Sequence, residues 1–411
     1  MKFAKLLSVV LLAVMLISTV SYGQSIPSGT GRYEALGYNP FIKDASIDIN
    51  RNPAWTTVYR NYVFGDIGRT EVGTDQYQLT EQFIGANFGV SKDLSLGLVL
   101  NKFEDSWTEF SPFSDSVGVQ RPVAPLKVTL GWQLSPKFAL GFAPYYAAWS
   151  SENQSSATNI SKWSSSSVGA TLGMLSKLDA GWIEGAVDFK SNSYKRDATV
   201  GTTNQIDNSE GGMNIAVFAR GFFTVNKSMG INLVPYLGFS TYSWNPMITP
   251  TPIGYPNEKF SHMNFNGGLG VNMPILEQGL LAGGLSFGYH QMKDESAPLN
   301  ATNTITSFVL PQFNIGLEWP FTDWFTGRLG YSRAVSSVKN ELVASSVTTY
   351  TKGTAVTSPD QTITAGLGFH FNRFSIDGSV GERLFKNGFY LMTGKTNDMF
   401  GMLSASYSFG K

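Results

Sequence analysis

Apolar and polar residues alternate along most of the chain from Leu94 to Phe409. The stretch 125–135 is the clearest example, with its apolar residues at Leu126, Val128, Leu130, Trp132 and Leu134. Lys127, Thr129 and Gln133 occupy the positions between them. A period of two places successive side chains on opposite faces of a β-strand. The pattern therefore predicts strands with one apolar face and one polar face.

Short and long connections alternate between these strands. Tight turns are predicted near residues 91–93, 135–137, 178–181, 226–230, 276–279, 322–323 and 372–373. Longer polar stretches occupy residues 104–124, 151–163, 195–211, 245–260, 293–305, 338–360 and 386–396. Strands of about ten residues joined in this way are typical of barrels that cross a membrane. We therefore predict an all-β fold, a transmembrane antiparallel β-barrel of about 14–16 strands, with a first strand near residues 58–67.

The N-terminus has the features of a secretory signal. Lys2 and Lys5 precede an apolar run from Leu6 to Val20, and small residues follow at Ser21 and Gly23. We predict a signal peptide over residues 1–23, a plug segment over residues 24–57 and the barrel over residues 58–411. Residues 24–57 do not alternate, yet they are too apolar for a free tail, so we expect them to fill the barrel lumen.

Composition excludes several classes of function. The chain has no cysteine, which excludes a disulfide framework and a cysteine nucleophile. Its 30 basic and 30 acidic residues cancel, so we expect no nucleic-acid partner. A hydrophobic fraction of 42% does not argue against a membrane, because a barrel strand mixes lipid-facing and water-facing residues.

Aromatic residues gather near both ends of the predicted strands. Trp132, Trp182, Trp319, Phe321, Trp324 and Phe325 lie beside short turns, and Trp107, Trp149, Trp244 and Tyr289 lie near long connections. Two such groups are typical of the belts at the two membrane interfaces. A soluble β-sandwich would also alternate, but it explains neither the belts nor the signal peptide.

The polar face carries charges of both signs. The candidate lumen-lining residues are Lys127, Glu184, Asp188, Arg220, Glu318, Arg328 and Asp377, and Lys190 lies on the same face. Such charges are tolerated in a membrane barrel where they meet water or each other. Two interpretations stay open, namely a lining of ion pairs that braces the wall and a surface that binds a solute.

The plug segment resembles a known family. The stretches Ser28–Arg32, Ile42–Asp44 and Arg51–Ala54 resemble the N-terminal hatch of the FadL/OmpP1/TodX outer-membrane transporters. The residues that carry this resemblance are Gly31, Arg32, Asp44, Arg51, Asn52, Pro53 and Ala54. The resemblance implies passive uptake of hydrophobic small molecules across the outer membrane of a Gram-negative (diderm) bacterium, with exit through a gap in the wall.

Prolines are candidates for the wall gap that the resemblance implies. Pro144, Pro235 and Pro311 lie inside predicted strands, where each removes a hydrogen bond from the ladder. For each one taken singly, a tolerated bulge is the preferred explanation. The Asn-Pro-Ala turn also resembles PorV/PorQ-type barrels, which serve protein secretion and would bind protein partners. A nonspecific or structural porin is the third alternative. The partners we expect are outer-membrane lipid and a hydrophobic ligand, with secretion-system proteins in the second alternative.

Catalytic and metal-binding motifs are not found in the sequence. The histidines are His262, His290 and His370, and the first two fall near the outer ends of predicted neighbouring strands. Two histidines without a third ligand at a fixed spacing are weak grounds for a metal site. We therefore predict no enzyme, no cofactor and no metal site.

Overall fold

The structure is a computed structural model. It describes residues 30–68, 83–103, 123–156, 159–200, 203–249, 258–275, 279–296, 301–344, 351–357, 361–381 and 402–409. The predicted signal peptide and the first residues of the predicted plug, 24–29, lie outside the described residues.

The described chain begins with short helices and continues as strands. The helices are α2 (Thr30–Ala35), α3 (Ala45–Arg51) and the 3₁₀ helix η1 (Pro53–Thr57). The strands are β1 (Tyr62–Gly68), β2 (Phe83–Gly89), β3 (Leu94–Phe103), β4 (Val123–Ser135), β5 (Phe138–Ser156), β6 (Asn159–Leu178), β7 (Gly181–Val200), β8 (Thr203–Asn226), β9 (Ile231–Thr249), β10 (Glu258–Ile275), β11 (Gly279–Ser296), β12 (Ala301–Thr322), β13 (Phe325–Ala344), β14 (Thr351–Thr357), β15 (Gln361–Phe371), β16 (Phe374–Gly381) and β17 (Met402–Ser408).

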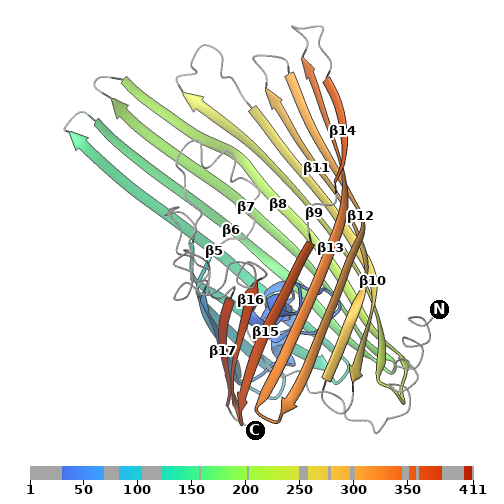
Figure 1. Ribbon diagram of the computed structural model, residues 1–411. Helices are drawn as coiled ribbons and strands as arrows, with labels where there is room; N and C mark the ends of the chain where they lie inside the picture. Colours follow the sequence, from blue (N-terminus) through green and yellow to red (C-terminus); the bar gives the residue numbers. More distant parts are fainter. Residues whose placement is uncertain are drawn as a thin grey trace, which may run out of the picture.

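Antiparallel pairing closes these strands into a ring (Figure 1). The last strand, β17, pairs with β1, which also pairs with β2. β14 and β15 both pair with β13, one with its residues 336–342 and the other with its residues 325–333. These two strands therefore share one position, and the ring has sixteen positions. The prediction of an antiparallel β-barrel of about 14–16 strands is confirmed, with sixteen as the number.

The two faces of the barrel wall differ in chemistry as the alternation predicts. Large apolar side chains are exposed on the outside, among them Trp132 and Leu172 at 60% each and Leu285 at 55%. Polar side chains such as Glu184, Arg220 and Asp377 are buried on the inside. Soluble monomers rarely expose a continuous apolar surface of this extent. Among the described residues, none of the helices has the length and apolar character that a membrane-crossing helix requires.

Strand length differs from the sequence-based prediction. Residues 151–156 belong to β5, residues 195–200 to β7 and residues 301–305 to β12, although all were expected in long connections. The first strand begins at Tyr62 rather than near residue 58, because η1 and a turn occupy residues 53–61. The upper parts of β6 and β7 carry polar residues on both faces, with Ser166 and Ser193 on the outer face and Ser165 and Asn192 on the inner face. Alternation therefore ends where the apolar belt ends, whereas backbone pairing continues.

Some aromatic residues face the lumen rather than the lipid side. Trp182 packs against Trp55 of η1, with ring centroids 5.8 Å apart. Trp244 is only 1% exposed and stacks on Tyr194, with centroids 5.1 Å apart. Their assignment to membrane belts was therefore wrong, because nearness to a strand end does not determine which face a side chain occupies. Trp132, Phe321 and Trp324 are exposed on the outside, as a belt requires.

Candidate functional site

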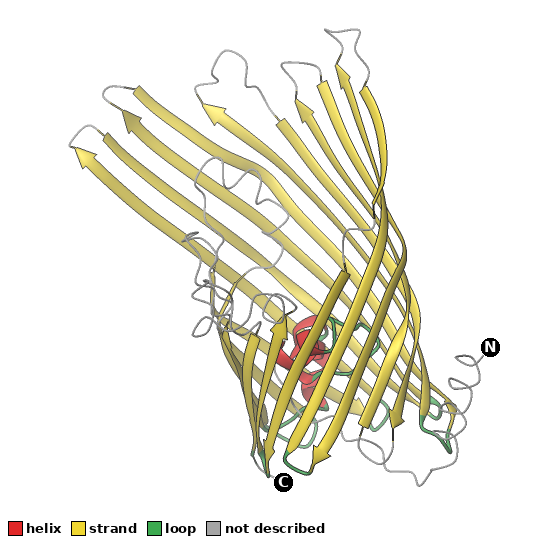
Figure 2. Cartoon of the chain, viewed as in Figure 1, coloured by secondary structure: helices red, strands yellow, loops and turns green. Residues whose placement is uncertain are grey.

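The helices α2, α3 and η1 lie inside the ring of strands (Figure 2). We call residues 30–57 the lumen segment. Asp44 caps α3, and its side chain accepts a hydrogen bond from the Ile47 backbone N–H. Asn52 caps η1 in the same way by accepting from the Ala54 N–H, 3.1 Å away, and Pro53 occupies the first helical turn. The Asn-Pro-Ala sequence is thus a helix start that turns the chain toward β1.

Glycines on the inner face of the wall let the lumen segment approach the strands closely. A Cβ added at Gly141 of β5 would collide with the backbone N of Ala54, and one at Gly131 of β4 would collide with the Thr56 hydroxyl. A Cβ at Gly270 of β10 would collide with the ring of Phe41. The segment therefore packs directly on the wall backbone at several places around the lumen.

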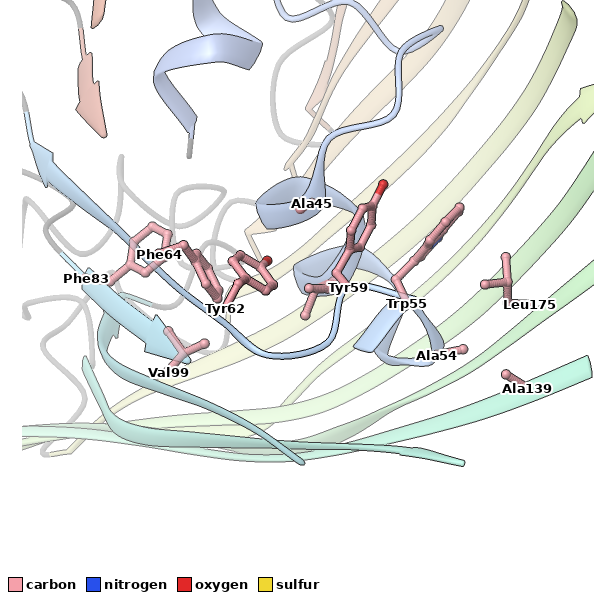
Figure 3. Packing of buried hydrophobic residues seen from close by; sticks show 11 residues of the cluster. Ala45, Ala54, Trp55, Tyr59, Tyr62, Phe64, Phe83, Val99, Ala139 and Leu175 are labelled. Atoms are coloured by element: carbon pink, nitrogen blue, oxygen red, sulfur yellow. The ribbon is translucent and has the colours of Figure 1, made fainter. Parts of the chain in front are cut away.

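An apolar cluster holds the C-terminal part of the lumen segment (Figure 3). Trp55 and Tyr59 stack with ring centroids 5.4 Å apart, and Trp55 is 1% exposed. Leu175 of β6 and Ala139 of β5 complete this side of the cluster. At the other side the cluster extends to Tyr62 and Phe64 of β1, so it joins the segment to the first strand of the barrel.

A buried ion cluster fixes α3 to β7 and β8, and we call it the Arg220 cluster. The Arg220 guanidinium contacts Asp48 at 2.5 Å and Glu184 at 2.6 Å, and all three side chains are 1% exposed. Arg220 also donates to the backbone carbonyl of Ile42 at 2.8 Å. Glu184 accepts from the Trp55 indole N–H at 2.5 Å. Asp48 and Trp55 thus bind, through their side chains, to charges that the wall strands supply.

A second ion cluster fixes α2 to β12, β13 and β16, and we call it the Arg32 cluster. Arg32 donates to both carboxylate oxygens of Glu318, at 2.8 and 3.1 Å, and contacts Asp44 at 3.3 Å. Arg328 contacts Glu318 and Asp377, each at 2.6 Å. A two-point contact between a guanidinium and a carboxylate fixes orientation as well as distance. The cluster therefore fixes both the position and the orientation of α2.

Three further predicted residues, Lys127, Asp188 and Arg51, make their contacts outside the two ion clusters. Lys127 of β4 lies 3.5 Å from the carbonyl oxygen of Asn50, at the end of α3. Asp188 of β7 accepts from Thr171 at 2.6 Å and pairs with Lys190 at 3.1 Å. Arg51 of α3 lies over the ring of Phe218, 4.4 Å from its centroid.

The glycine at the start of α2 is held by the wall. The Gly31 N–H donates to the Ser404 hydroxyl of β17 at 3.2 Å. A Cβ at Gly31 would lie 2.7 Å from the Asp377 carbonyl oxygen, which no larger residue accommodates without a shift.

Sequence reasoning missed several residues that hold the lumen segment. Asp48 and Trp55 are central to the Arg220 cluster, and Asp66 accepts from the Thr30 N–H at 3.1 Å. Asp48 follows the capping Asp44 by four residues, so both lie on the same side of a short helix. This spacing is the one signal in the sequence that could have indicated Asp48. No pattern in the sequence identifies Asp66 as a partner of Thr30.

Lys43 occupies a position that the sequence analysis also missed. Its ammonium lies near the rings of Phe222, Trp182 and Trp55, at 4.7, 5.5 and 6.0 Å from their centroids. Burial lowers the pKa of this ammonium to about 8. The ammonium thus makes cation–π contacts with one ring of the lumen segment and two of the wall.

Backbone pairing between β4 and β5 is interrupted. Val123 pairs with Ala148, and the next pair is Leu130 with Phe142. Residues 124–129 therefore have no partner on β5 in the described ladder, a stretch of about 20 Å at the usual rise of a strand. Pro144 lies within the unpaired part of β5 and still pairs with Ala170 on its other side. We call this interruption the wall break.

The other two prolines that the sequence analysis singled out, Pro235 and Pro311, are accompanied by smaller irregularities. Pro311 lies at a bulge in β12, between the pairs of Val309 and Gln312. Pro235 lies at a gap in the pairing of β8 with β9. The pairs on either side of the gap are Arg220–Tyr236 and Phe223–Leu233, and the register is the same on both sides. Each of Pro144, Pro235 and Pro311 thus lies at an interruption of strand pairing, as predicted. Of these three interruptions, the one at Pro144 is the longest.

The wall break lies directly beside the lumen segment. Gly131 and Gly141, which contact η1, belong to the first paired residues next to the break. Lys127, which lies near the Asn50 carbonyl, belongs to the unpaired stretch of β4. The inner side of the break thus faces the lumen segment. Its outer side carries exposed apolar residues, including Leu126 and Tyr146.

Comparisons with known proteins return similar barrels at low identity. No protein-family profile and no curated protein sequence matches the chain. The monoaromatic hydrocarbon channel CymD is 9% identical over 95% of this chain and 100% of that chain, with a TM-score of 0.41. The Ralstonia pickettii toluene transporter TbuX is 11% identical over 94% of this chain and 100% of that chain, with a TM-score of 0.40.

The ferric yersiniabactin uptake receptor FyuA from Yersinia pestis is a third similar structure. It is 9% identical over 85% of this chain and 80% of that chain, with a TM-score of 0.38. At these identities and TM-scores the likeness carries no information on substrate. The closed ladder of strand pairs by itself establishes the barrel.

Proposed function

We propose that this protein is an outer-membrane transporter through which hydrophobic small molecules pass without an energy source. The exposed apolar surface of the wall supports a membrane location, because it would otherwise have to be covered by lipid or protein. The lumen segment supports a closed resting state toward the periplasm, because it packs against the inner wall through two buried ion clusters.

The wall break beside the lumen segment is the observation that carries the proposal. An apolar molecule that reaches the lumen gains little from a watery path to the periplasm, because its transfer into water is unfavourable. The break offers the shorter route from the lumen to the membrane interior. Its outer side is apolar at Leu126 and Tyr146, which suits the release of such a molecule into lipid.

A disulfide across the wall break tests this route. The chain has no cysteine, so paired substitutions give a single possible crosslink. Continuing the register of the pair Leu130–Phe142 places Leu126 opposite Tyr146, and both face the lipid side. Leu126→Cys with Tyr146→Cys should therefore close the break when oxidised. Leu130→Cys with Phe142→Cys is the matched control, because it joins the same two strands where they already pair.

The readout is uptake of the hydrophobic fluorophore 1-N-phenylnaphthylamine by diderm cells that express each variant. We expect the wild type to raise uptake over cells without the protein. The oxidised break crosslink should reduce uptake to the background level, and a reductant should restore it. The control crosslink should leave uptake unchanged.

Two results would overturn the proposal in different ways. Undiminished uptake through the oxidised break crosslink would show that molecules leave by another route. Wild-type uptake no higher than background would remove the transport function itself. Steady ion conductance in planar bilayers, or copurification of secretion proteins, would then favour the porin or the secretion-associated alternative.

A further inference from the structure

Two of the three histidines of the chain lie side by side on the inner wall. His262 belongs to β10 and His290 to β11, and their ring centroids are 4.0 Å apart with an interplanar angle of 34°. His262 is 8% exposed. Rings this close place the imidazole nitrogens of both residues in one small region of the wall.

The register of β10 and β11 adds a third ligand. Met292 pairs directly with His262, and His290 precedes Met292 by two residues on the same face. This face is the inner one, because Asn272 and Gly270 of the same face of β10 contact Phe41 of the lumen segment. Two imidazoles and one thioether therefore share a small area of the inner wall.

We propose that His262, His290 and Met292 form a binding site for a copper ion, with a preference for Cu⁺. Thioether sulfur is a soft ligand that selects Cu⁺, and imidazole binds copper in both of its common oxidation states. Among the described residues no group of three or more histidine, aspartate or glutamate side chains is placed to hold a metal ion. The ligand set therefore differs from the carboxylate-rich sets that favour harder cations.

The surroundings of the three residues suit a soft metal ion. Tyr242 pairs with His262 across β9 and β10, and Phe260 precedes His262 on the same face. Tyr242 and Phe260 belong to an apolar cluster with Trp244. An apolar shell limits the access of water to the ligands and so favours the lower charge of Cu⁺ over Cu²⁺.

The copper site lies apart from the lumen segment and the wall break. His262 is ten residues along β10 from Asn272, the position that binds Phe41, which corresponds to about 30 Å along a strand. The proposal therefore does not depend on the transport function, and metal binding is measured without an uptake assay.

A competition titration tests the site. The protein is prepared without a histidine tag, folded in detergent, and titrated with Cu⁺ under anaerobic reducing conditions against a chromophoric Cu⁺ chelator. We expect one Cu⁺ per chain. His262→Gln and His290→Gln should each weaken binding by at least about a hundredfold, because loss of a group that only supports a ligand already costs about 10–100-fold.

Two further variants separate the ligand set from nonspecific binding. Met292→Leu keeps size and apolarity but lacks sulfur, so it should weaken Cu⁺ binding at least tenfold and leave the weaker binding of Zn²⁺ unchanged. His370→Gln is the matched control, because His370 of β15 bonds to Ser375 near a short turn and should not contribute.

Each outcome decides the proposal. Retention of wild-type Cu⁺ affinity in His262→Gln and His290→Gln would overturn the site, as would equal losses in His370→Gln. Equal losses of Zn²⁺ and Cu⁺ in Met292→Leu would overturn the role of the thioether. Unchanged β-barrel circular dichroism and unchanged heat-dependent gel mobility show that each variant is folded.

Discussion

At the scale of single residues, the attachment of the lumen segment depends on buried charges. Arg220, Glu184 and Asp48 are almost fully shielded from solvent, so each charge requires the others. Removing one partner of a buried ion pair leaves an uncompensated charge, which costs more than the pair itself contributes. The wall charges are therefore compensated only while the lumen segment is bound, and the charge of the segment only while it contacts the wall.

Replacing Arg220 tests this dependence. Arg220→Met keeps most of the side-chain volume but leaves Glu184 and Asp48 without their cation. We expect the free energy of unfolding to fall by about 3–5 kcal/mol. Lys162→Met is the control, because its ion pair with Glu152 is more than half exposed and should contribute less than about 1 kcal/mol. Urea unfolding in lipid vesicles, followed by tryptophan fluorescence, measures both, and equal effects would contradict the expectation.

The lowered pKa of Lys43 predicts that docking of the lumen segment on the barrel wall depends on pH. Its pKa is about 8 in the docked segment against an ordinary value of 10.5. Between these values the undocked segment binds more protons, so docking should strengthen as pH rises from about 8 to 10.5. Lys43→Met should lack this increase. The measurement is the rate at which a protease cuts the lumen segment at several pH values, and a pH slope shared by both proteins would contradict the assignment to Lys43.

Residue roles were only partly predictable from the sequence. Arg32, Asp44 and Asn52 could be chosen because a local motif contains them, and Glu184, Arg220, Glu318, Arg328 and Asp377 because a charge on the polar face of a strand must face the lumen. Which of these charges would meet could not be predicted, because the partners are up to 286 residues apart in the chain. Asp48 has only its spacing of four residues from Asp44 as a local signal, and no pattern indicates that the Trp55 indole would meet Glu184.

At the scale of elements, small residues in the strands decide how closely the helices dock. Gly141 of β5 leaves room for the backbone of η1 at Ala54. The same position on a regular barrel strand would normally carry a larger inward side chain. The glycine content of the sequence thus reflects helix docking as well as strand packing.

Gly141→Val should force η1 away from the wall. Overpacking of this kind costs about 1–3 kcal/mol, and the damage should be confined to the lumen segment. Gly288→Ala is the control, because a Cβ there would meet its nearest neighbour, Val309, at an ordinary 3.7 Å. Limited proteolysis reports the exposure of residues 30–57. Equal protection in both variants would show that contact between Gly141 and Ala54 is not needed for docking.

Strands were predictable where they cross the apolar belt and less so above it. Alternation correctly indicated the lipid-facing positions of β10, such as Phe265 and Leu269, which are exposed. It gave no signal where both faces are polar, so the upper parts of β5, β7 and β12 were assigned to loops. The presence of Pro144 indicated a possible irregularity, but only the pairing on both sides of β5 shows how far it extends.

At the scale of the whole molecule, the barrel wall and the lumen segment have different roles. The wall provides an apolar outside and a charged inside, and the segment occupies the space between opposite parts of the wall (Figure 2). A barrel of this size would otherwise enclose a water-filled channel. The number of strands followed from counting turns, whereas the packing of the segment depended on contacts across the ring.

Deleting residues 30–57 should convert the protein into an open pore. The deletion removes Arg32 and Asp48, so the remaining wall charges, including Arg220 and Glu318, face water in the lumen. We expect a several-fold increase in single-channel conductance in planar bilayers. The double variant Leu130→Cys with Phe142→Cys serves as an intact-segment control with wild-type conductance. A deletion variant that conducts no more than the wild type would show that other parts of the chain fill the lumen.

The contacts of the lumen segment have a consequence for how the barrel is assembled. α2 touches β13, β15, β16 and β17, whereas η1 touches β3, β4, β5 and β6. The sheet closes when Tyr62 of β1 pairs with Ser408 of β17, two residues from opposite ends of the chain. A seam between such distant sequences forms slowly when chance encounter alone brings its edges together. Here one short piece of chain binds strands on either side of the seam, so we expect it to serve as an internal template on which the last pairing is made.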